Sequence, residues 1–372
     1  MMVDEMTLWW ENMAGPRMFI EKIATSLSDG KNVVLRLDGD LPWHSSMRDY
    51  LAHQLSPVQI RQATLQSGEK QEIIPQLLKQ LSKVNVGHCP QDYKQQISYV
   101  KDQGAFQDCV IWIELEPGCD PYRVMQFLSD FRGKSLSESG CFVLEVPTGQ
   151  CLPNFSKFVA VLNGSEAIRP DDLHLFSSIL ADGICELPDS FRNYAAWLAA
   201  DLAGKNGELV PTILQALKPT EEPAVIWAAL EEEYEFIPRK TTSELKQLIW
   251  QAQLQTVFAD IEMERLKITT RWEAVITVAL QTKAWDPKKN ESYFVRQFGE
   301  EIECAANVEL GTLVHMMSLR KSDDHSQWLL YIPDDESREW ICFLCACRNK
   351  LAHHKDCQPE EIIRLLSELS RR

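Results

Sequence analysis

Four short apolar runs separated by helical patterns constrain the fold of this chain more than any other feature. They are NVVLRL (residues 32–37), DCVIWIELE (108–116), GCFVLEVP (140–147) and FVAVLN (158–163). Each has the length of a buried strand and is bounded by polar or turn residues. Helices are expected between them, over LPWHSSMRDYLAHQL, with Ser45 or Ser46 as its cap, and over EIIPQLLKQLSKV and YRVMQFLSDF. This alternation predicts an α/β domain with a mostly parallel sheet covered on both faces.

From about residue 167 onward the pattern is almost entirely helical. The segment EEEYEFIPRKTT (231–242) is a candidate linker whose threonines could cap the next helix, and ESYFVRQFGEEIECAANVELGTLVHMMSL (291–319) is expected to be helical. We therefore predict an α/β domain followed by an all-α C-terminal bundle. The expected domains are residues 1–165, a helical lid or middle region at 166–230, and a helical bundle at 243–372.

The formal net charge of −16 limits how the chain can contact nucleic acid. Proteins that grip long nucleic acids carry a basic face, and this sequence has no long basic run. Any RNA contact must therefore be local, short-lived or supported by a partner.

Cysteine usage and hydropathy indicate a compartment. The eleven cysteines are scattered, and several lie in apolar runs, as buried free thiols do in a reducing cytosol. No run approaches the ~18 apolar residues of a membrane span, and the acidic start MMVDEMTLWWENM is unlike a signal peptide. We expect a cytoplasmic protein that does not contact the membrane.

The order of elements over roughly residues 10–215 resembles AAA or STAND-type nucleotide-binding domains. The resemblance includes acids at a strand end (Glu114, Glu116) and EVPTG (145–149) at the place of the sensing strand. A working phosphate loop needs glycines, a Lys and a Ser or Thr. The equivalent segment, DGDLPWHSSMRD (38–49), opens with two acids, Asp38 and Asp40, and has no Lys, and RGKS (132–135) lacks the glycine five residues earlier. We therefore expect a degenerate domain that hydrolyses no nucleotide and holds no cofactor.

The C-terminal third contains Arg348-Asn349-Lys350-Leu351-Ala352-His353 after an apolar helical segment. Arg-x4-His also occurs at Arg48–His53, Arg169–His174 and Arg320–His325. Only the 348–353 copy combines Asn in second place with a surrounding helical bundle. In that setting it resembles the signature of the HEPN family, helical proteins that include many RNA-cutting toxins and defence effectors. The resemblance covers about residues 243–372.

The resemblance implies that Arg348, Asn349 and His353 are catalytic and that neither a metal nor a cofactor is needed. A histidine with a pKa near ~6.5 can act as base or acid at neutral pH. A guanidinium stabilises charge on phosphoryl oxygens, and Asn349 would orient the imidazole or the phosphate. Residues five apart on a helix point about 140° away from each other. In the family a second copy of the motif completes the site, which implies a homodimer or a related helical partner.

Two other readings of this segment stay open. Basic residues near a helix C-terminus also favour the macrodipole and the terminal carbonyls without any catalysis. Cys342, Cys345, Cys357 and either His353 or His354 could instead hold zinc, although the first pair lies in the apolar run WICFLCAC.

These features lead to two functional hypotheses. The first is a metal-independent endoribonuclease of a bacterial antiphage defence or toxin system, with RNA as substrate and the α/β domain as regulator. The alternative is a non-catalytic scaffold or regulatory subunit of a nucleotide-driven defence complex, which would bind a partner ATPase or nuclease.

Overall fold

The computed structural model describes residues 4–37, 39, 41–81, 88–131, 135–155 and 157–371. The chain divides into two compact units. The first contains Met1–Phe176 and Lys205–Glu208, and the second contains Ser177–Gly204 and Leu209–Arg372. The predicted boundaries at 165, 230 and 243 stay predictions.

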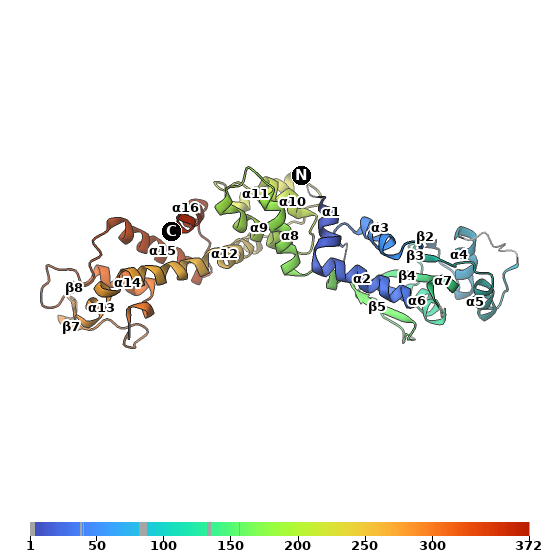
Figure 1. Ribbon diagram of the computed structural model, residues 1–372, viewed down its shortest axis with the longest axis horizontal. Coiled ribbons are helices and arrows are strands. Elements are labelled where there is room, and N and C mark those ends of the chain that lie inside the picture. The colour runs from blue at the N-terminus through green and yellow to red at the C-terminus, as the bar shows by residue number, and fades with distance from the viewer. Residues whose placement is uncertain are drawn as a thin grey trace. The chain divides into compact units, whose positions relative to one another are not determined.

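The first unit is built on a five-stranded parallel sheet with the order β2-β3-β4-β1-β5 (Figure 1). The four apolar runs form four of its strands, so the predicted mostly parallel α/β domain is confirmed. The strands are β1 (Asn32–Leu37), β2 (Gln59–Leu65), β3 (Cys109–Leu115), β4 (Cys141–Pro147) and β5 (Val159–Asn163). The helices are α1 (Glu5–Thr7), α2 (Ala14–Ser28), α3 (His44–Leu55), α4 (Ile73–Leu81), α5 (Tyr93–Asp102), α6 (Pro121–Asp130), α7 (Leu136–Ser139) and α8 (Pro170–Asp182), which continues into the second unit.

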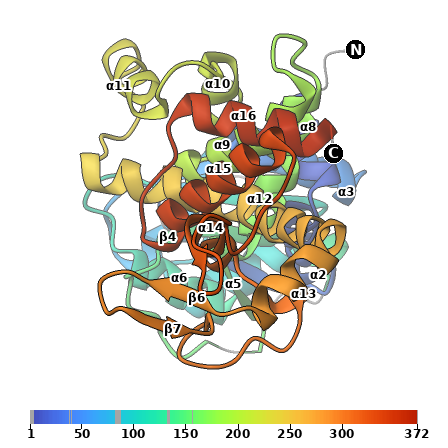
Figure 2. The same ribbon diagram turned by 90° about the vertical axis from the view of Figure 1, so that its left-hand side faces the viewer.

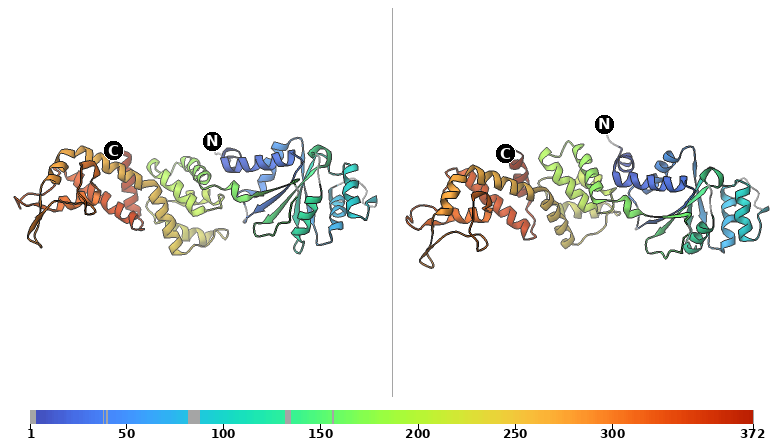
Figure 3. Two further views of the ribbon diagram at one scale, coloured as in Figure 1. Left: turned by 90° about the horizontal axis from the view of Figure 1, so that it is seen from below. Right: turned by 60° about the horizontal axis from the view of Figure 1, so that its bottom comes forward.

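Burial on both faces explains why the central strands read as continuous apolar runs. Val34, Ile111 and Phe142 on one face belong to a core with residues of α4 and α6. Val33 and Val143, on the opposite face, are also fully buried. Figure 3 shows helices beside the strands in two further views.

The edge strand β2 was not expected from the sequence, because it is polar. Only Ala63 and Leu65 of its seven residues are buried. It pairs with β3 over its whole length, so backbone hydrogen bonds, rather than an apolar run, define it as a strand.

The second unit is mainly helical, as predicted. Its helix α12 packs against α9, α15 and α16. The helices are α9 (Asp189–Ala203), α10 (Leu209–Ala216), α11 (Pro223–Glu233), α12 (Thr242–Arg271), α13 (Glu273–Gln281), α14 (Leu310–Ser318), α15 (Asp335–Ala352) and α16 (Pro359–Arg371). Thr241 caps α12 in a capping box with Glu244, which confirms the predicted threonine cap. None of the helices in the described ranges is long and apolar enough to cross a membrane.

The prediction of a continuous helical stretch over residues 291–319 is wrong. A small antiparallel sheet with the order β7-β6-β8 forms here instead, with β7 inside the stretch and β6 and β8 on either side of it; Figure 2 labels β6 and β7. Its strands are β6 (Ala284–Asp286), β7 (Glu291–Tyr293) and β8 (Arg320–Lys321). Only Leu310–Ser318 of the stretch forms an α-helix. Phe298 precedes Gly299, and both have a positive φ, a conformation that a helix interior does not allow.

Candidate functional site

Helix α15 carries the predicted catalytic residues Arg348 and Asn349. Acidic residues in its first turn favour the helix start. Its face with Trp340, Leu344, Cys347 and Leu351 is buried, which anchors the helix in the unit. The RNKLAH segment therefore lies at the C-terminal end of a well-packed helix.

The end of α15 fixes the backbone around His353. His353 is the C-cap, and His354 follows with φ of 56°. The Lys355 N–H donates to the Lys350 carbonyl at 2.9 Å, and the His354 N–H donates to the Leu351 carbonyl at 3.3 Å. These two bonds form a Schellman motif with His354 in place of the usual glycine. The His354 ring packs against Trp250 with the centroids 4.5 Å apart.

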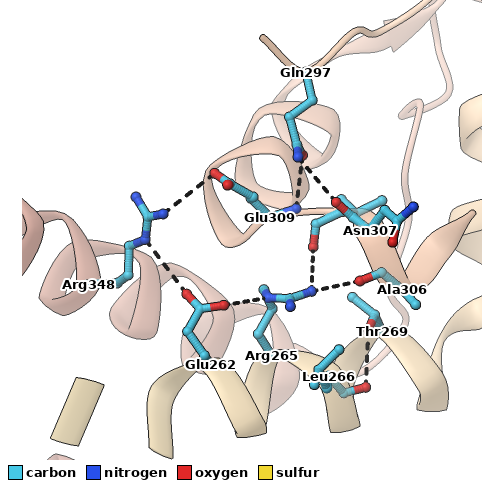
Figure 4. A network of polar contacts seen from close by, with 10 residues as sticks. Glu262, Arg265, Leu266, Thr269, Gln297, Ala306, Asn307, Glu309 and Arg348 are labelled. Atoms are coloured by element: carbon cyan, nitrogen blue, oxygen red, sulfur yellow. Dashed lines mark hydrogen bonds and ion pairs between the residues drawn. The ribbon is translucent and has the colours of Figure 1, made fainter. Parts of the chain in front are cut away.

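Two carboxylates hold the Arg348 guanidinium in place. Its Nε lies 3.7 Å from Glu262 on α12, and its Nη2 lies 3.7 Å from Glu309, the N-cap of α14 (Figure 4). The Arg348 side chain is 29% exposed. Neither ion pair uses Nη1, so one nitrogen of the fork lies outside both pairs.

A second arginine extends this network. The Nε of Arg265 donates to Glu262 at 2.8 Å, and its Nη1 donates to the carbonyls of Ala306 and Val308. Gln297 accepts from the Glu309 N–H at 3.0 Å. The contacts thus connect α12, α15 and the segment before α14 (Figure 4), and the two arginines balance the charges of the two glutamates.

Asn349 and His353 are exposed. The Asn349 amide donates to the Cys345 Sγ on its own helix at 3.5 Å. Among the described residues, no side-chain hydrogen bond or ion pair joins Arg348, Asn349 and His353 to one another. One chain therefore presents the guanidinium and the imidazole separately, as their spacing on the helix predicts.

The phosphate-loop position in the first unit differs from a nucleotide site. Asp38 and Asp40 lie outside the described residues. Trp43 takes the left-handed conformation (φ 49°) immediately before α3, and its N–H donates to the Glu208 carboxylate. The Glu208 carboxylate of the chain itself therefore accepts the hydrogen bond of a backbone N–H at the start of α3.

The predicted serine cap of α3 is wrong. The helix begins at His44 after Trp43, and no side chain caps it. The Ser46 hydroxyl instead donates to the Trp43 carbonyl at 2.8 Å, because the left-handed Trp43 places Ser46 inside the first turn. In RGKS, residues 132–134 lie outside the described residues, and Ser135 caps the short helix α7.

Two side chains of α3 cover the acids at the carboxyl ends of β3 and β4. The His44 Nε2 lies 2.8 Å from Glu145, which also accepts from the Trp112 indole at 3.0 Å. Arg48, one turn after His44, lies 3.5 Å from Glu114. Ligands of parallel α/β sheets bind outside this edge. Here the two acids are paired with a histidine and an arginine. The sequence reasoning missed the pair of His44 and Glu145, which lie 101 residues apart in the chain.

The alternative zinc ligands do not meet. Cys342 is exposed, whereas Cys345 and Cys357 are buried. The Cys357 thiol contacts the Cys347 carbonyl at 4.0 Å. The described residues contain no group of three or more His, Cys, Asp or Glu side chains that could hold a metal ion.

Taken together, the fold is an α/β domain with a five-stranded parallel sheet, joined to a helical C-terminal region. The chain is similar to a mutant of RuvB from Thermotoga maritima, at 10% identity over 68% of this chain and 78% of that one, with a TM-score of 0.33. It is also similar to Drosophila ORC bound to DNA, at 11% identity over 98% of this chain and 88% of that one, with a TM-score of 0.32. Identities and scores this low transfer no activity. No family model and no curated protein sequence matches the chain.

Proposed function

We propose that the chain is a metal-independent endoribonuclease of the HEPN type, with Arg348, Asn349 and His353 as its catalytic residues. The observation that carries the proposal is the RNKLAH segment at the end of α15, with Asn349 and His353 exposed and Arg348 oriented by Glu262 and Glu309. A guanidinium that is already held in place needs less free energy to reach its position in the transition state than a mobile guanidinium does.

In the proposed reaction His353 takes the proton from a ribose 2′-hydroxyl. The 2′-oxygen attacks the adjacent phosphorus, and the bond from phosphorus to the 5′-oxygen breaks. The leaving 5′-oxygen takes a proton from water and the protonated His353 releases its own proton to water, so the products end in a 2′,3′-cyclic phosphate and a 5′-hydroxyl. Arg348 stabilises the charge on the phosphoryl oxygens, and Asn349 orients the phosphate or the imidazole.

A second chain is part of the proposal. The Arg348 guanidinium is directed to α12 and α14, whereas His353 lies at the exposed end of α15. Two chains related by a two-fold axis would let the imidazole of one approach the guanidinium of the other. We propose a homodimer, or a dimer with a related helical protein, acting in a defence or toxin system and restrained by the α/β unit.

The test is RNA cleavage by the purified full-length protein in EDTA. Arg348→Ala and His353→Ala should each lower the cleavage rate by about 100-fold or more, in the range seen for removal of a catalytic acid–base or charge-stabilising group, about 10²–10⁴. Lys355→Ala is the matched control, because it removes an exposed cation from the same helix end outside the motif. Cleavage by both motif variants at the parent rate would show that the site is wrong.

A second candidate function is a non-catalytic regulatory subunit of a nucleotide-driven complex. Two observations favour it: Glu114, Glu145 and the Trp43 N–H are all occupied by partners within the chain, and the charge of Arg348 is balanced by carboxylates. Full biological activity of His353→Ala, together with stable co-purification of an ATPase or nuclease, would select this function. Loss of activity in His353→Ala would exclude it.

A further inference from the structure

The small sheet of the second unit carries a row of side chains that the proposed active site does not use. Trp285 on β6 lies opposite Ser292 on β7 and Arg320 on β8. Directly opposite residues of antiparallel strands share a face. Arg320 also forms a bridge with Trp328. Two tryptophans therefore lie on one face of the sheet with an arginine between them.

Each aromatic ring on this face is paired with a basic side chain. The Arg320 guanidinium carbon lies 3.2 Å from the centroid of the Trp328 ring. His325 stacks on Trp285 with centroids 4.6 Å apart and planes inclined by 24°. Two residues before Trp285, and so on the same face, Lys283 places its Nζ 5.5 Å from the Phe294 ring. We call this set the aromatic–basic row; it consists of Lys283, Trp285, Phe294, Arg320, His325 and Trp328.

Acidic residues of the strands lie on the other face. Asp286 is opposite Glu291, and strand alternation places both away from Trp285. The Asp286 carboxylate accepts from the backbone N–H groups of Lys288 and Lys289 in the turn. The carboxylates of β6 and β7 thus lie on the face opposite the aromatic–basic row.

Solvent reaches the row, because Phe294 is 47% exposed and Trp328 is 39% exposed. Exposed aromatic faces next to cations suit one kind of ligand in particular. Unpaired bases stack on aromatic rings while the neighbouring phosphates contact cations. Paired bases in a duplex keep their faces stacked on one another and cannot do so. An apolar protein segment would match the rings but leave the cations Lys283 and Arg320 without counter-charge.

We propose that the aromatic–basic row binds single-stranded RNA and holds it on the second unit. The choice of RNA over DNA rests on the proposed function. The row also provides the local contact that a chain with a net charge of −16 requires, since cations close to the backbone phosphates dominate such binding.

The experiment is fluorescence anisotropy with full-length protein in EDTA at low salt. The probe is a labelled single-stranded RNA of about twelve nucleotides, within the site sizes of single-strand binders, fully 2′-O-methylated so that it cannot be cleaved. Arg320→Ala and Trp328→Leu should each raise Kd by about 5-fold or more, as expected for loss of one stacking or phosphate contact. Trp328→Phe keeps an aromatic face and should bind within about 2-fold of the parent, because stacking needs only that face.

Lys321→Ala is the matched control, because it removes a cation one residue after Arg320 from the opposite face of β8. Its Kd should stay close to that of the parent, and the duplex form of the probe should bind more weakly than the single strand. Circular dichroism and the melting temperature show whether each variant folds. Equal losses in Lys321→Ala and Arg320→Ala would reduce the effect to general charge and overturn the proposal, as would tighter binding of the duplex or no binding by the parent.

The outcome separates this proposal from the nuclease. If the parent binds RNA, the row variants bind it less tightly and no RNA is cleaved, the binding proposal is supported and the nuclease proposal is wrong. If the parent cleaves RNA and the folded Arg320→Ala and Trp328→Leu variants bind and cleave like it, the nuclease stands and the row is wrong. If Arg320→Ala and Trp328→Leu lose a co-purifying protein while their RNA binding is unchanged, the face binds a protein partner instead.

Discussion

At the scale of single residues, one buried polar side chain has all its hydrogen-bond partners and another lacks one. The Asn32 side chain is 1% exposed and makes three hydrogen bonds. Its amide donates to the carbonyls of Leu128 and Phe131 at the end of α6, and its carbonyl accepts from the Phe142 N–H on β4. One side chain therefore fastens the end of α6 to two central strands.

Asn32→Ala should lower the free energy of unfolding by about 3 kcal/mol, because it leaves buried backbone groups without partners and each such group costs about 1–3 kcal/mol. Urea denaturation measures the loss, and Ala at the exposed Asn12 serves as control. A change below about 1 kcal/mol, the net worth of one ordinary hydrogen bond, would show that these bonds are not intact in solution.

Asp201 on α9 is the opposite case. Its Oδ2 is buried without a hydrogen-bond partner in the described part of the chain, and burial raises the pKa of its carboxyl to about 6. The folded state thus holds this proton more tightly than the unfolded chain, whose carboxyl has a pKa near 3.8. The group therefore destabilises the fold at neutral pH, and the penalty fades as the pH falls through about 6 toward about 4.

Asp201→Asn should therefore raise the free energy of unfolding at about pH 7.5 by about 1–2 kcal/mol, a figure reduced for partial solvent screening. The gain should shrink toward zero near about pH 4. Urea denaturation across this range measures it, with Asn at the exposed Asp189 of the same helix as control. A gain of the same size at every pH would contradict the assignment.

At the scale of elements, the strands that have an apolar pattern were predicted from the sequence. The strands that are defined only by pairing with a neighbouring strand were missed. Strands β1, β3, β4 and β5 were predicted because each is an apolar run. The strand β2 and the three strands of the small sheet have no such run. They are held by backbone hydrogen bonds to neighbouring strands, and a single sequence does not display which segments pair.

The same contrast applies to helix ends. The threonines that end the segment 231–242 were expected to cap α12, and Thr241 does so in a capping box with Glu244, a pattern of residues close together in the chain. The predicted serine cap of α3 was wrong, because the left-handed Trp43 precedes the helix and packs its ring against Trp9 and Phe176. These tertiary contacts replace the local cap.

Thr241→Ala should destabilise the second unit by about 1 kcal/mol through loss of the capping box of α12. Thr242→Ala, one residue further into the helix, should be neutral or slightly stabilising, because alanine has the highest helix propensity. Denaturation monitored by circular dichroism compares the two. Equal effects of the two substitutions would mean that the cap does not form.

At the scale of the whole molecule, the candidate site depends on what the sequence could and could not reveal. The motif at 348–353 was visible because its residues are neighbours in the chain. The carboxylates that hold Arg348, those of Glu262 and Glu309, lie far earlier in the sequence and carry no signature of their own. The aromatic–basic row was likewise hidden, because strand pairing assembles it from segments around residues 285 and 320.

Nucleotide binding by the first unit is also tested at this scale. His44 pairs with Glu145, and Arg48 pairs with Glu114. The Trp43 N–H donates to the Glu208 carboxylate. All these groups are therefore occupied by partners within the chain. We expect no rise in the melting temperature with millimolar ATP and magnesium, whereas a ligand present at about 100 times its Kd would add about 2.7 kcal/mol. A clear rise would show that these pairs open for a nucleotide.

The most direct test of the account is the chemistry of the RNA ends after incubation with dialysed protein in EDTA. Attack by the 2′-oxygen, with His353 as base, predicts fragments ending in a 2′,3′-cyclic phosphate and a 5′-hydroxyl. It also predicts no fragments from His353→Ala and none from a 2′-O-methylated substrate. Fragments with 5′-phosphates that disappear in EDTA, or identical fragments from parent and His353→Ala, would contradict it.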